Sequence, residues 1–343
     1  MTDLPIAVER RDASLRSDLA AAAAVFASAF AILLAAFVGS ALLLAGERVL
    51  WTGQGPVPAA RFCIFLSLIT AYSLAGLVLL RRGAARDFTE LRPRSGADPV
   101  RWQVWVARFQ SRRADAIAAA VGAVFGLAIN ELGAALAARS WVLPWIGLRI
   151  WSAVLNALLF ASLALLARWS VVQIGALRAI GRRIPVSLLD QRPLVPFVRA
   201  GLRAAIAWLV GSSLAFTLLL DVIAPSLVFA VIGGTMGIGI AALLLPSAGL
   251  NERLRAEKDR ELAWIRAEIA TARAALARSD AASREEAARL PALLAWETRV
   301  ADASTWPFDV PTLLRFALLL LVPLGSWLGG ALVEWVVDRW LGG

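Results

Sequence analysis

Repeated apolar runs, each long enough to cross a lipid bilayer, constrain this chain more than any other feature. A helix needs about 20 mainly apolar residues to cross the hydrocarbon core of a bilayer. Hydrophobic residues make up 59% of the 343-residue chain, and its mean hydropathy is +0.71. We therefore predict an all-α fold, a polytopic transmembrane helical bundle of about seven spans. The expected spans are 19–46, 62–80, 114–136, 150–167, 204–220, 227–245 and 312–336.

The number of crossings has alternatives. The run 19–46 is longer than the apolar core of a cleaved signal peptide, so we expect it to stay as the first span. Six spans are possible if one helix pair is misjudged, and 204–245 could be re-entrant, which would leave five full crossings. The fourth run could continue as a helix beyond the bilayer toward Gly181.

Arginine is distributed unevenly between alternate loops, and this predicts the orientation. Residues 81–113 contain nine Arg and residues 178–203 contain six, whereas 47–61 and 137–150 contain two each. Cytoplasmic loops carry the excess of basic residues, so the N-terminus and residues 251–304 are expected inside and the C-terminus outside. We expect a protein of the bacterial cytoplasmic (inner) membrane.

The stretch 251–304 is long, strongly charged and patterned as two helices. Apolar residues recur at three- and four-residue steps in each arm. The seam residues are Leu262, Ile265, Ile269, Ala272 and Leu276 in the first arm, and Ala287, Leu290, Leu294 and Ala301 in the second. Ser283 and Glu286 form a capping box that would start the second helix. We predict a cytoplasmic antiparallel helical hairpin.

This reading divides the chain into four parts. They are a cytoplasmic N-terminal segment (1–18), spans one to six with an interfacial helix near 98–113 (19–250), the hairpin (251–304), and the last span with a short external C-terminus (305–343).

The hairpin is expected to bind protein and not nucleic acid. It contains ten acidic and ten basic residues, whereas the whole chain carries a formal net charge of +10. Nucleic-acid binding depends on surplus positive charge, which the neutral hairpin lacks. Its two seams could satisfy each other, which would make it a self-packed arm. A protein partner or a second copy would then contact residues outside the seams, with Trp264 and Trp296 as anchors.

The loop that contains residues 98–113 carries a second helical pattern. Trp102, Trp105, Val106 and Phe109 share one face, and arginines occupy the others, which is typical of a helix lying at lipid headgroups. We expect anionic lipid to be attracted here. The alternative is that these arginines only fix the topology. The candidate lipid contacts are Arg81, Arg82, Trp102, Trp105, Arg108, Arg112 and Arg113.

One acidic residue, Glu131, interrupts an apolar run. A charge within a span costs a few kcal/mol, so it should face the bundle interior or a partner. An outward-facing cation or proton vestibule could therefore include Glu131, Asn130, Asn156, Asp221 and Glu334. The alternative is a helix-fixing ion pair of Glu131 with Arg61, Arg149 or Arg339.

Glycine pairs spaced four residues apart occur in three of the expected spans, at Gly122/Gly126, Gly233/Gly237 and Gly325/Gly329. This spacing lets helix backbones approach closely. The contacts could lie within one bundle or between copies in a homo-oligomer, and the pattern does not separate the two.

The residue inventory argues against an enzyme. The chain contains no His, one Cys (Cys63) and one Lys (Lys258), which excludes Ser-His-Asp triads, His-based metal sites and His general bases. We assign no catalytic, cofactor-binding or metal-binding residue. We expect a non-enzymatic interaction, scaffold or sensing subunit that uses its hairpin; the alternative is an ion or proton channel or transporter with a vestibule around Glu131.

Overall fold

The computed structural model is almost entirely helical, and six of its helical stretches are long and apolar enough to cross a membrane. It describes residues 4–45, 51–52, 55–56, 58–95, 99–136, 146–188, 192–219, 225–276, 288–306, 308, 313–314, 316–318 and 320–321. Within these residues the stretches are Arg16–Ala41, Phe62–Leu91, Trp102–Leu132, Arg149–Gly181, Val195–Leu214 and Gly233–Ala274. The all-helical prediction is confirmed, and most of the seventh expected span, 312–336, lies outside the described residues.

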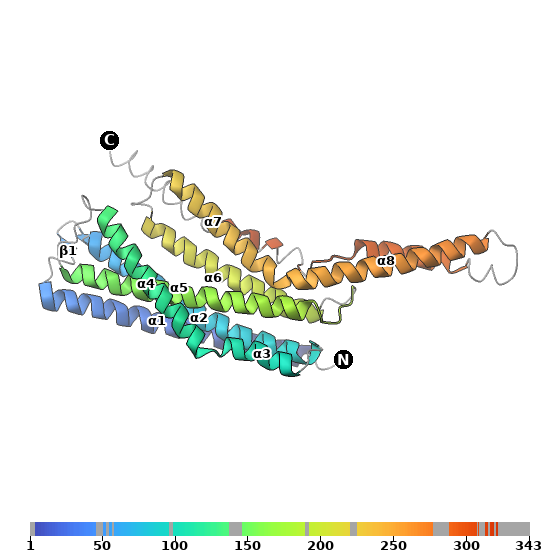
Figure 1. The fold of residues 1–343 in the computed structure, drawn as a ribbon, viewed down its shortest axis with the longest axis horizontal. Helices are drawn as coiled ribbons and strands as arrows, with labels where there is room; N and C mark the ends of the chain where they lie inside the picture. The colour runs from blue at the N-terminus through green and yellow to red at the C-terminus, as the bar shows by residue number, and fades with distance from the viewer. Residues whose placement is uncertain are drawn as a thin grey trace.

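Figure 1 shows the elements in space. The α-helices are α1 (Leu4–Ala45), α2 (Pro58–Leu91), α3 (Pro99–Phe109), α4 (Arg112–Leu136), α5 (Ile146–Gly181), α6 (Val195–Leu219), α7 (Pro225–Leu244), α8 (Ala248–Leu276) and α10 (Leu290–Asp302). Short 3-10 turns are η2 (Arg92–Arg94), η3 (Arg192–Leu194) and η4 (Leu245–Ser247). The two-residue strands β1 (Trp51–Thr52) and β2 (Gly55–Pro56) pair antiparallel, with Trp51 opposite Pro56.

Helices α1 to α7 form the bundle, and α8 with α10 forms an arm that extends beyond it (Figure 1). We call the end of the bundle from which α8 leaves the arm end, and the opposite end, which carries β1 and β2, the far end. Helices α1, α2 and α5 contain 42, 34 and 36 residues. At 1.5 Å per residue they measure about 50–65 Å, well over the roughly 30 Å of a bilayer core. The expected continuation of the fourth run to Gly181 is confirmed.

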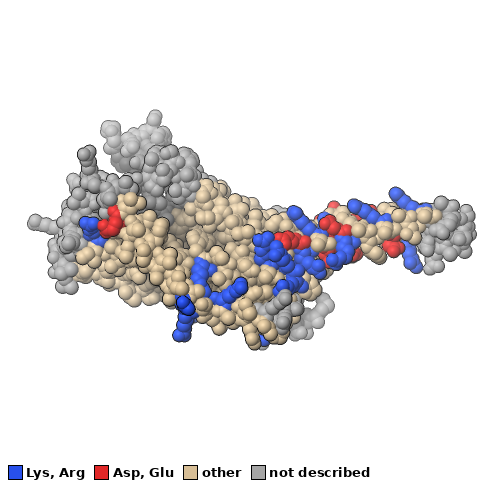
Figure 2. Space-filling view, viewed as in Figure 1, with Lys and Arg blue, Asp and Glu red and all other residues tan. Residues whose placement is uncertain are grey.

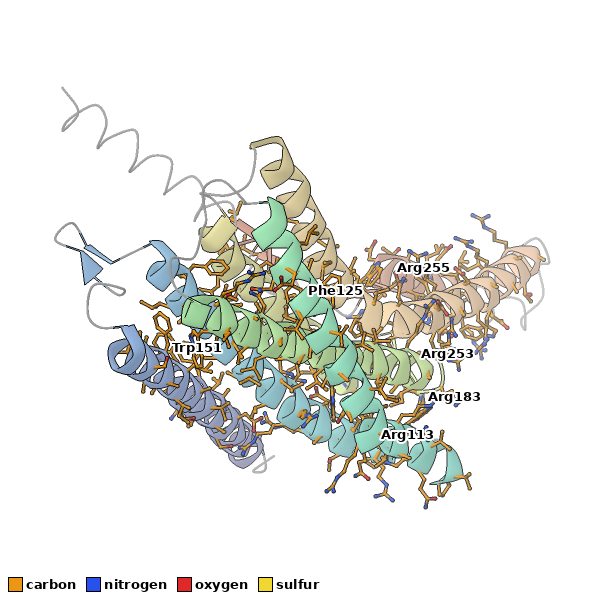
Figure 3. The ribbon with its side chains drawn as sticks, turned by 60° about the vertical axis from the view of Figure 1, so that its left-hand side comes forward. Arg113, Phe125, Trp151, Arg183, Arg253 and Arg255 are labelled. Atoms are coloured by element: carbon orange, nitrogen blue, oxygen red, sulfur yellow. The ribbon has the colours of Figure 1, made fainter. Side chains whose placement is uncertain are left out.

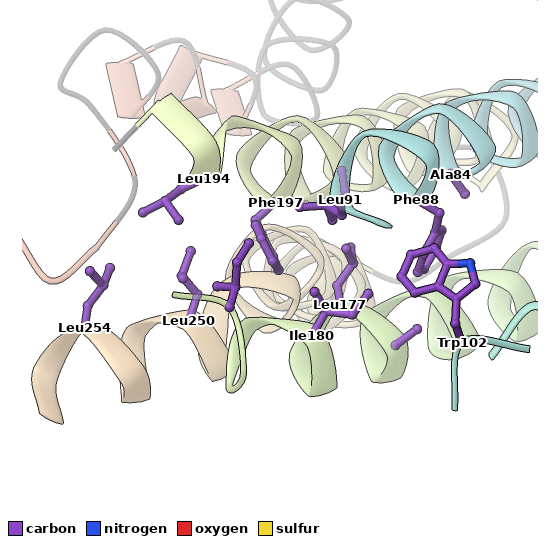
Figure 4. Packing of buried hydrophobic residues seen from close by; sticks show 13 residues of the cluster. Ala84, Phe88, Leu91, Trp102, Leu177, Ile180, Leu194, Phe197, Leu250 and Leu254 are labelled. Carbon is purple, nitrogen blue, oxygen red and sulfur yellow. The ribbon is translucent and has the colours of Figure 1, made fainter. Parts of the chain in front are cut away.

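The extra length of these helices builds an apolar cluster at the arm end. Phe88 and Leu91 of α2, Ile180 of α5, Phe197 of α6 and Leu250 of α8 are buried together there. Figure 4 shows the cluster, with α8 entering it through Leu250 and Leu254. The start of the arm is therefore part of the core of the bundle.

Helix α3 covers this cluster with its aromatic face, which was predicted to contact lipid. Trp102 is only 9% exposed and packs edge-on against Phe88, with ring centroids 5.9 Å apart. Val100 and Val104, on the opposite face, are 63% and 47% exposed. A helix is present where one was predicted, but the predicted lipid contact of Trp102 is wrong, because the lengthened ends of α2 and α5 supply a protein surface that buries it.

Two of the glycine pairs behave differently. In α4, a Cβ atom at Gly122 or Gly126 would collide with the backbone of α5 at Phe160 or Asn156, so this pair permits close packing within the chain. In α7, a Cβ atom at Gly233 or Gly237 would meet nothing within 4 Å among the described residues. Gly325 and Gly329 lie outside the described residues.

The joint between α7 and α8 is tightly packed. The two helices are connected by η4, in which Pro246 and Ser247 are buried. A Cβ atom at Gly249 would collide with the backbone carbonyl of Arg178, and one at Gly181 would lie 2.8 Å from the Leu250 backbone nitrogen. Glycine is needed at both positions because α8 crosses the end of α5 with almost no separation.

In the arm, α10 runs back along α8. Lys258 of α8 donates hydrogen bonds to the carbonyl oxygens of Ala301 and Ala303, 2.5 and 2.9 Å away, at the end of α10. Ile265, Ile269 and Val300 are buried between the helices. Leu262, Leu290, Leu293 and Trp296 pack around them.

The two predicted seams fare differently in this helix pair. Ile265, Ile269 and Ala272 of the first are buried. In the second, Leu290 packs against the arm core as predicted, but Leu294 is 43% exposed and Ala301 is also exposed, so these two positions are wrong. Leu293, Trp296 and Val300 occupy the contact instead. The side chains of Leu276 and Ala287, and the proposed capping box at Ser283 and Glu286, lie outside the described residues.

Candidate functional site: charged networks at the two ends of the bundle

The far end holds the candidate polar site, which the structure resolves into two separate pairs. A nitrogen of Arg149 donates to the Glu131 carboxylate over 2.9 Å, with both side chains more than half exposed. Asn156 donates to the amide oxygen of Asn130 over 3.2 Å. Glu131 is therefore paired with Arg149, one of the three arginines in the predicted helix-fixing ion pair. No second carboxylate among the described residues joins this pair. Asp221 and Glu334 lie outside the described residues.

The arm end holds a more deeply buried charge, Asp87 of α2. Its side chain is fully buried and accepts hydrogen bonds from Arg199, 2.9 Å away, and from Arg203. Both arginines project from α6 one turn apart, and Arg203 is only 7% exposed. Arg199 also donates to Glu90 over 2.7 Å. Each buried charge therefore has an opposite charge in contact, as burial requires.

Gly83 makes room for this network. A Cβ atom at position 83 would overlap the guanidinium of Arg203, which Asp87 holds in place. One turn further along α2, Arg86 forms an ion pair with Asp18 of α1, whose side chain is almost buried. Ion pairs from α2 therefore reach both α1 and α6 at the arm end.

A second network surrounds Asp115, in the first turn of α4. Its carboxylate accepts from Arg81 of α2 over 3.0 Å, from Arg168 of α5, and from the indole nitrogen of Trp169 over 3.1 Å. The guanidinium of Arg81 also lies over the Trp169 ring, 4.5 Å from its centroid. Arg168 donates in addition to the carbonyl oxygen of Arg108 over 2.9 Å.

Next to this network is a pocket of about 410 Å³. It is lined by Arg81, Phe109, Gln110, Arg112, Asp115 and Trp169. Helices α2, α3, α4 and α5 and the turn between α3 and α4 contribute to it, so its shape depends on how these four helices pack.

The base of the arm carries a third group of ion pairs. Glu252 of α8 accepts from Arg178, in the last turn of α5, over 3.0 Å, and from Arg182, just past the end of that helix, over 2.7 Å. It lies past the apolar run that ends at residue 245. The hydrogen bonds from Arg182 and Arg178 lower the pKa of the Glu252 carboxyl to about 2. Figure 3 shows Arg183, Arg253 and Arg255 around the same base, away from Phe125 and Trp151.

The two candidate anchors of the arm have different surroundings. Trp264 is 52% exposed on α8 and remains accessible. Trp296 packs between α8 and α10, and its indole nitrogen donates to Glu261 over 3.1 Å. Trp296 therefore holds the arm together.

The candidate lipid contacts also divide. Arg82, Arg108, Arg112 and Arg113 have exposed side chains. Arg81 is half-buried and bonded to Asp115, while Trp102 is buried and Trp105 partly buried against the protein. Four of the five arginines are therefore exposed, whereas Trp102 is buried and Trp105 is partly covered by protein.

The acceptors of these networks, Asp87 and Asp115, and their donors Arg168, Arg199 and Arg203 were not predicted from the sequence. A signal was present: Arg199 and Arg203 are one helical turn apart at the start of an apolar helix, so one face must carry both charges. Asp115 likewise is an isolated acid at the start of an apolar run. A count of charges in each loop uses these residues only to predict the orientation of the chain, so it does not reveal that they pair with residues of other helices.

Within the described residues, no group of three or more Cys, Asp or Glu side chains is arranged to hold a metal ion. Compared with known protein families, with characterised proteins and with solved structures, the chain shows no match.

Proposed function

We propose that this chain is a multi-pass membrane protein, without enzymatic activity, whose α8/α10 arm is a cytoplasmic docking element for a protein partner or a second copy. The observation that carries the proposal is the continuity of α7, η4 and α8. The arm begins inside the core of the bundle and projects beyond it (Figure 1). A connection between two spans needs only about two to eight residues, so an arm of this size requires another purpose.

Membrane insertion is supported by the distribution of apolar and charged surface. Six stretches of the described chain are long and apolar enough to cross a bilayer. In Figure 2 the charged residues gather on the arm and the adjoining part of the bundle, and most of the remaining described surface is uncharged. The arginine-rich loops belong to the arm end, which favours a cytoplasmic arm in a bacterial inner membrane, with the N-terminus inside and the C-terminus outside.

The surface of the arm favours protein recognition over nucleic-acid binding. Its apolar seam is closed by α10, and its charges balance. The exposed Trp264 gives one aromatic contact on this otherwise charged surface. Large aromatic side chains at the centre of a contact supply much of its binding energy.

Deletion of residues 255–300 behind a short flexible linker tests the proposal. We expect the bundle of the truncated protein to unfold at nearly the same temperature in detergent, but to lose its oligomeric state or its co-purifying protein, as measured by native mass spectrometry. Trp264→Ala, which leaves the α8/α10 seam intact, should weaken the same association. A truncated protein that keeps its oligomeric state and every partner would contradict the proposal.

The alternative function, a channel or transporter with a vestibule around Glu131, has weaker support. Proton and ion pathways show several polar groups converging within the membrane. Glu131 is instead paired with Arg149 and more than half exposed. Flux of protons and cations into liposomes, compared between the natural protein and Glu131→Gln, separates the two functions: flux that falls with the substitution would favour the channel.

A further inference from the structure

The pocket beside Asp115 has the chemistry of a phosphate site. Two arginines, Arg81 and Arg112, line it together with one carboxylate, Asp115. Arg168, bound to the same carboxylate, adds a third positive charge, so the group is positive overall. Arginine guanidinium groups recognise phosphate oxygens through paired hydrogen bonds. The volume of about 410 Å³ is within the range of small-molecule sites and suits a headgroup-sized ligand.

Arg81, one of the residues that line the pocket, is held in place by two neighbours. Asp115 and the Trp169 ring fix the Arg81 side chain from two sides, yet 41% of that side chain remains exposed. A ligand that binds Arg81 therefore does not have to order a freely moving side chain, which lowers the entropic cost of binding. Trp169 in turn is held by its hydrogen bond to Asp115.

The other wall of the pocket adds unneutralised positive charge. Arg112 is the first residue of α4, its side chain is exposed, and no ion pair in the described part of the chain involves it. At the start of α4 the N–H groups of Ala114 and Asp115 donate to Ser111, which leaves those of Arg112 and Arg113 to favour an anion. Asp115 alone, already bound by three donors, does not balance these charges.

We propose that this pocket binds a phosphate ester, supplied by the headgroup of an anionic phospholipid in the cytoplasmic leaflet. Arg81 and Arg112 hold the phosphate oxygens, and Trp169 forms the wall beneath Arg81. Basic pockets between the cytoplasmic ends of membrane helices suit such headgroups. The lipid as the source rests on the proposed membrane insertion, whereas the phosphate chemistry rests on the pocket alone.

The decisive comparison is between Arg112→Gln and Arg113→Gln. The two substitutions remove the same charge from neighbouring exposed positions, but only Arg112 lines the pocket. The full chain is titrated with phosphatidylglycerol, and with phosphatidylcholine as the uncharged reference, by native mass spectrometry. Because one basic residue beside an anionic headgroup contributes on the order of fivefold in affinity, we expect that loss for Arg112→Gln and less than about twofold for Arg113→Gln.

A soluble phosphate ester, sn-glycerol 3-phosphate, is titrated in parallel by calorimetry. Saturable binding of the soluble ester that is weakened by Arg112→Gln and not by Arg113→Gln supports the phosphate site. If the two variants then bind phosphatidylglycerol equally well, the site is assigned a soluble ligand. Equal effects of both substitutions, or no binding of either probe, overturn the proposal. Extraction of the protein from cell membranes without detergent would refute membrane insertion, and the calorimetric result would still stand on its own.

Discussion

Two carboxylates that are both bonded to arginine, Glu131 at the far end and Asp87 at the arm end, occupy opposite extremes of this molecule. Glu131 and its single partner Arg149 are more than half exposed. Asp87 is fully buried and bound by two arginines of α6. Hydropathy draws attention to Glu131, because it interrupts an apolar run. Burial and the number of partners instead identify Asp87 as the charge on which the packing depends.

The difference follows from what each pair replaces when it forms. In an exposed ion pair, each side chain gives up contacts with water for its contact with the other. The net contribution to the free energy of unfolding is close to zero, about 0–1 kcal/mol. A buried carboxylate has no water to return to, so loss of a partner leaves a charge without compensation. The contributions of the two sites to stability should therefore differ.

Asp87→Asn should produce the largest effect. It leaves Arg203, only 7% exposed, without its carboxylate, and we expect the free energy of unfolding to fall by about 3–5 kcal/mol. Thermal unfolding in detergent measures this, with Glu131→Gln as the matched carboxylate-to-amide control. Equal shifts for the two variants would show that burial does not separate them.

Gly83→Ala should have the next largest effect, because the added methyl group overlaps the Arg203 guanidinium and displaces it from Asp87. We expect a loss of about 1–3 kcal/mol, as for other overpacked sites. Gly175→Ala is the control, since a Cβ atom there meets nothing within 4 Å in the described structure; it should be neutral or stabilising by up to about 1 kcal/mol. If Gly175→Ala destabilises as much, the account of Gly83 is incorrect.

Glu131→Gln should change stability by no more than about 1 kcal/mol. The small contribution of an exposed pair also weakens further as salt increases, because mobile ions screen it. Unfolding of the natural protein and the variant, measured at low and high salt, should converge at high salt. A loss that is large and independent of salt would place Glu131 in a site like that of Asp87.

Glu252 should give the smallest effect, and it extends the comparison to a charge outside the bundle. Its carboxyl pKa is lowered to about 2 by Arg182 and Arg178, so the stabilising contribution is present above the unfolded value of about 4.3 and is lost as pH falls through about 2. Between neutral pH and about pH 4.5 we expect no change in the distance between spin labels on α5 and α8. A change in that interval would mean that another group titrates at the joint.

The sequence was sufficient for features that depend on local composition. Apolar runs gave helices able to cross a membrane, and Gly122 and Gly126 gave a close helix contact, here with α5. It was insufficient where the partner comes from a distant element. The aromatic face of 98–113 was assigned to lipid because amphipathicity shows that a face is covered but not what covers it. The ends of α2 and α5 cover it in the structure.

For the same reason, the second seam of the arm was predicted only in part and the partners of Asp87 were not predicted. In α10, several apolar residues lie close enough in sequence to form more than one seam, so Leu294 and Leu293 could not be ranked without α8. Asp87 is surrounded in sequence by arginines, but its actual partners lie more than 100 residues away, at Arg199 and Arg203. Periodicity carries no information on such pairings.

The packed joint at η4 has a mechanical consequence. Gly249 and Gly181 bring α8 against α5 without space for independent rotation, and Glu252 adds two ion pairs across the same point. Helix α8 contains 29 residues, so the arm acts as a lever of about 43 Å. A tilt of about 10° in the bundle helices would move the tip of the lever by roughly 7 Å, enough to make or break a contact between proteins. Under the proposed membrane insertion, a change in bilayer thickness that alters helix tilt would move the tip of the arm.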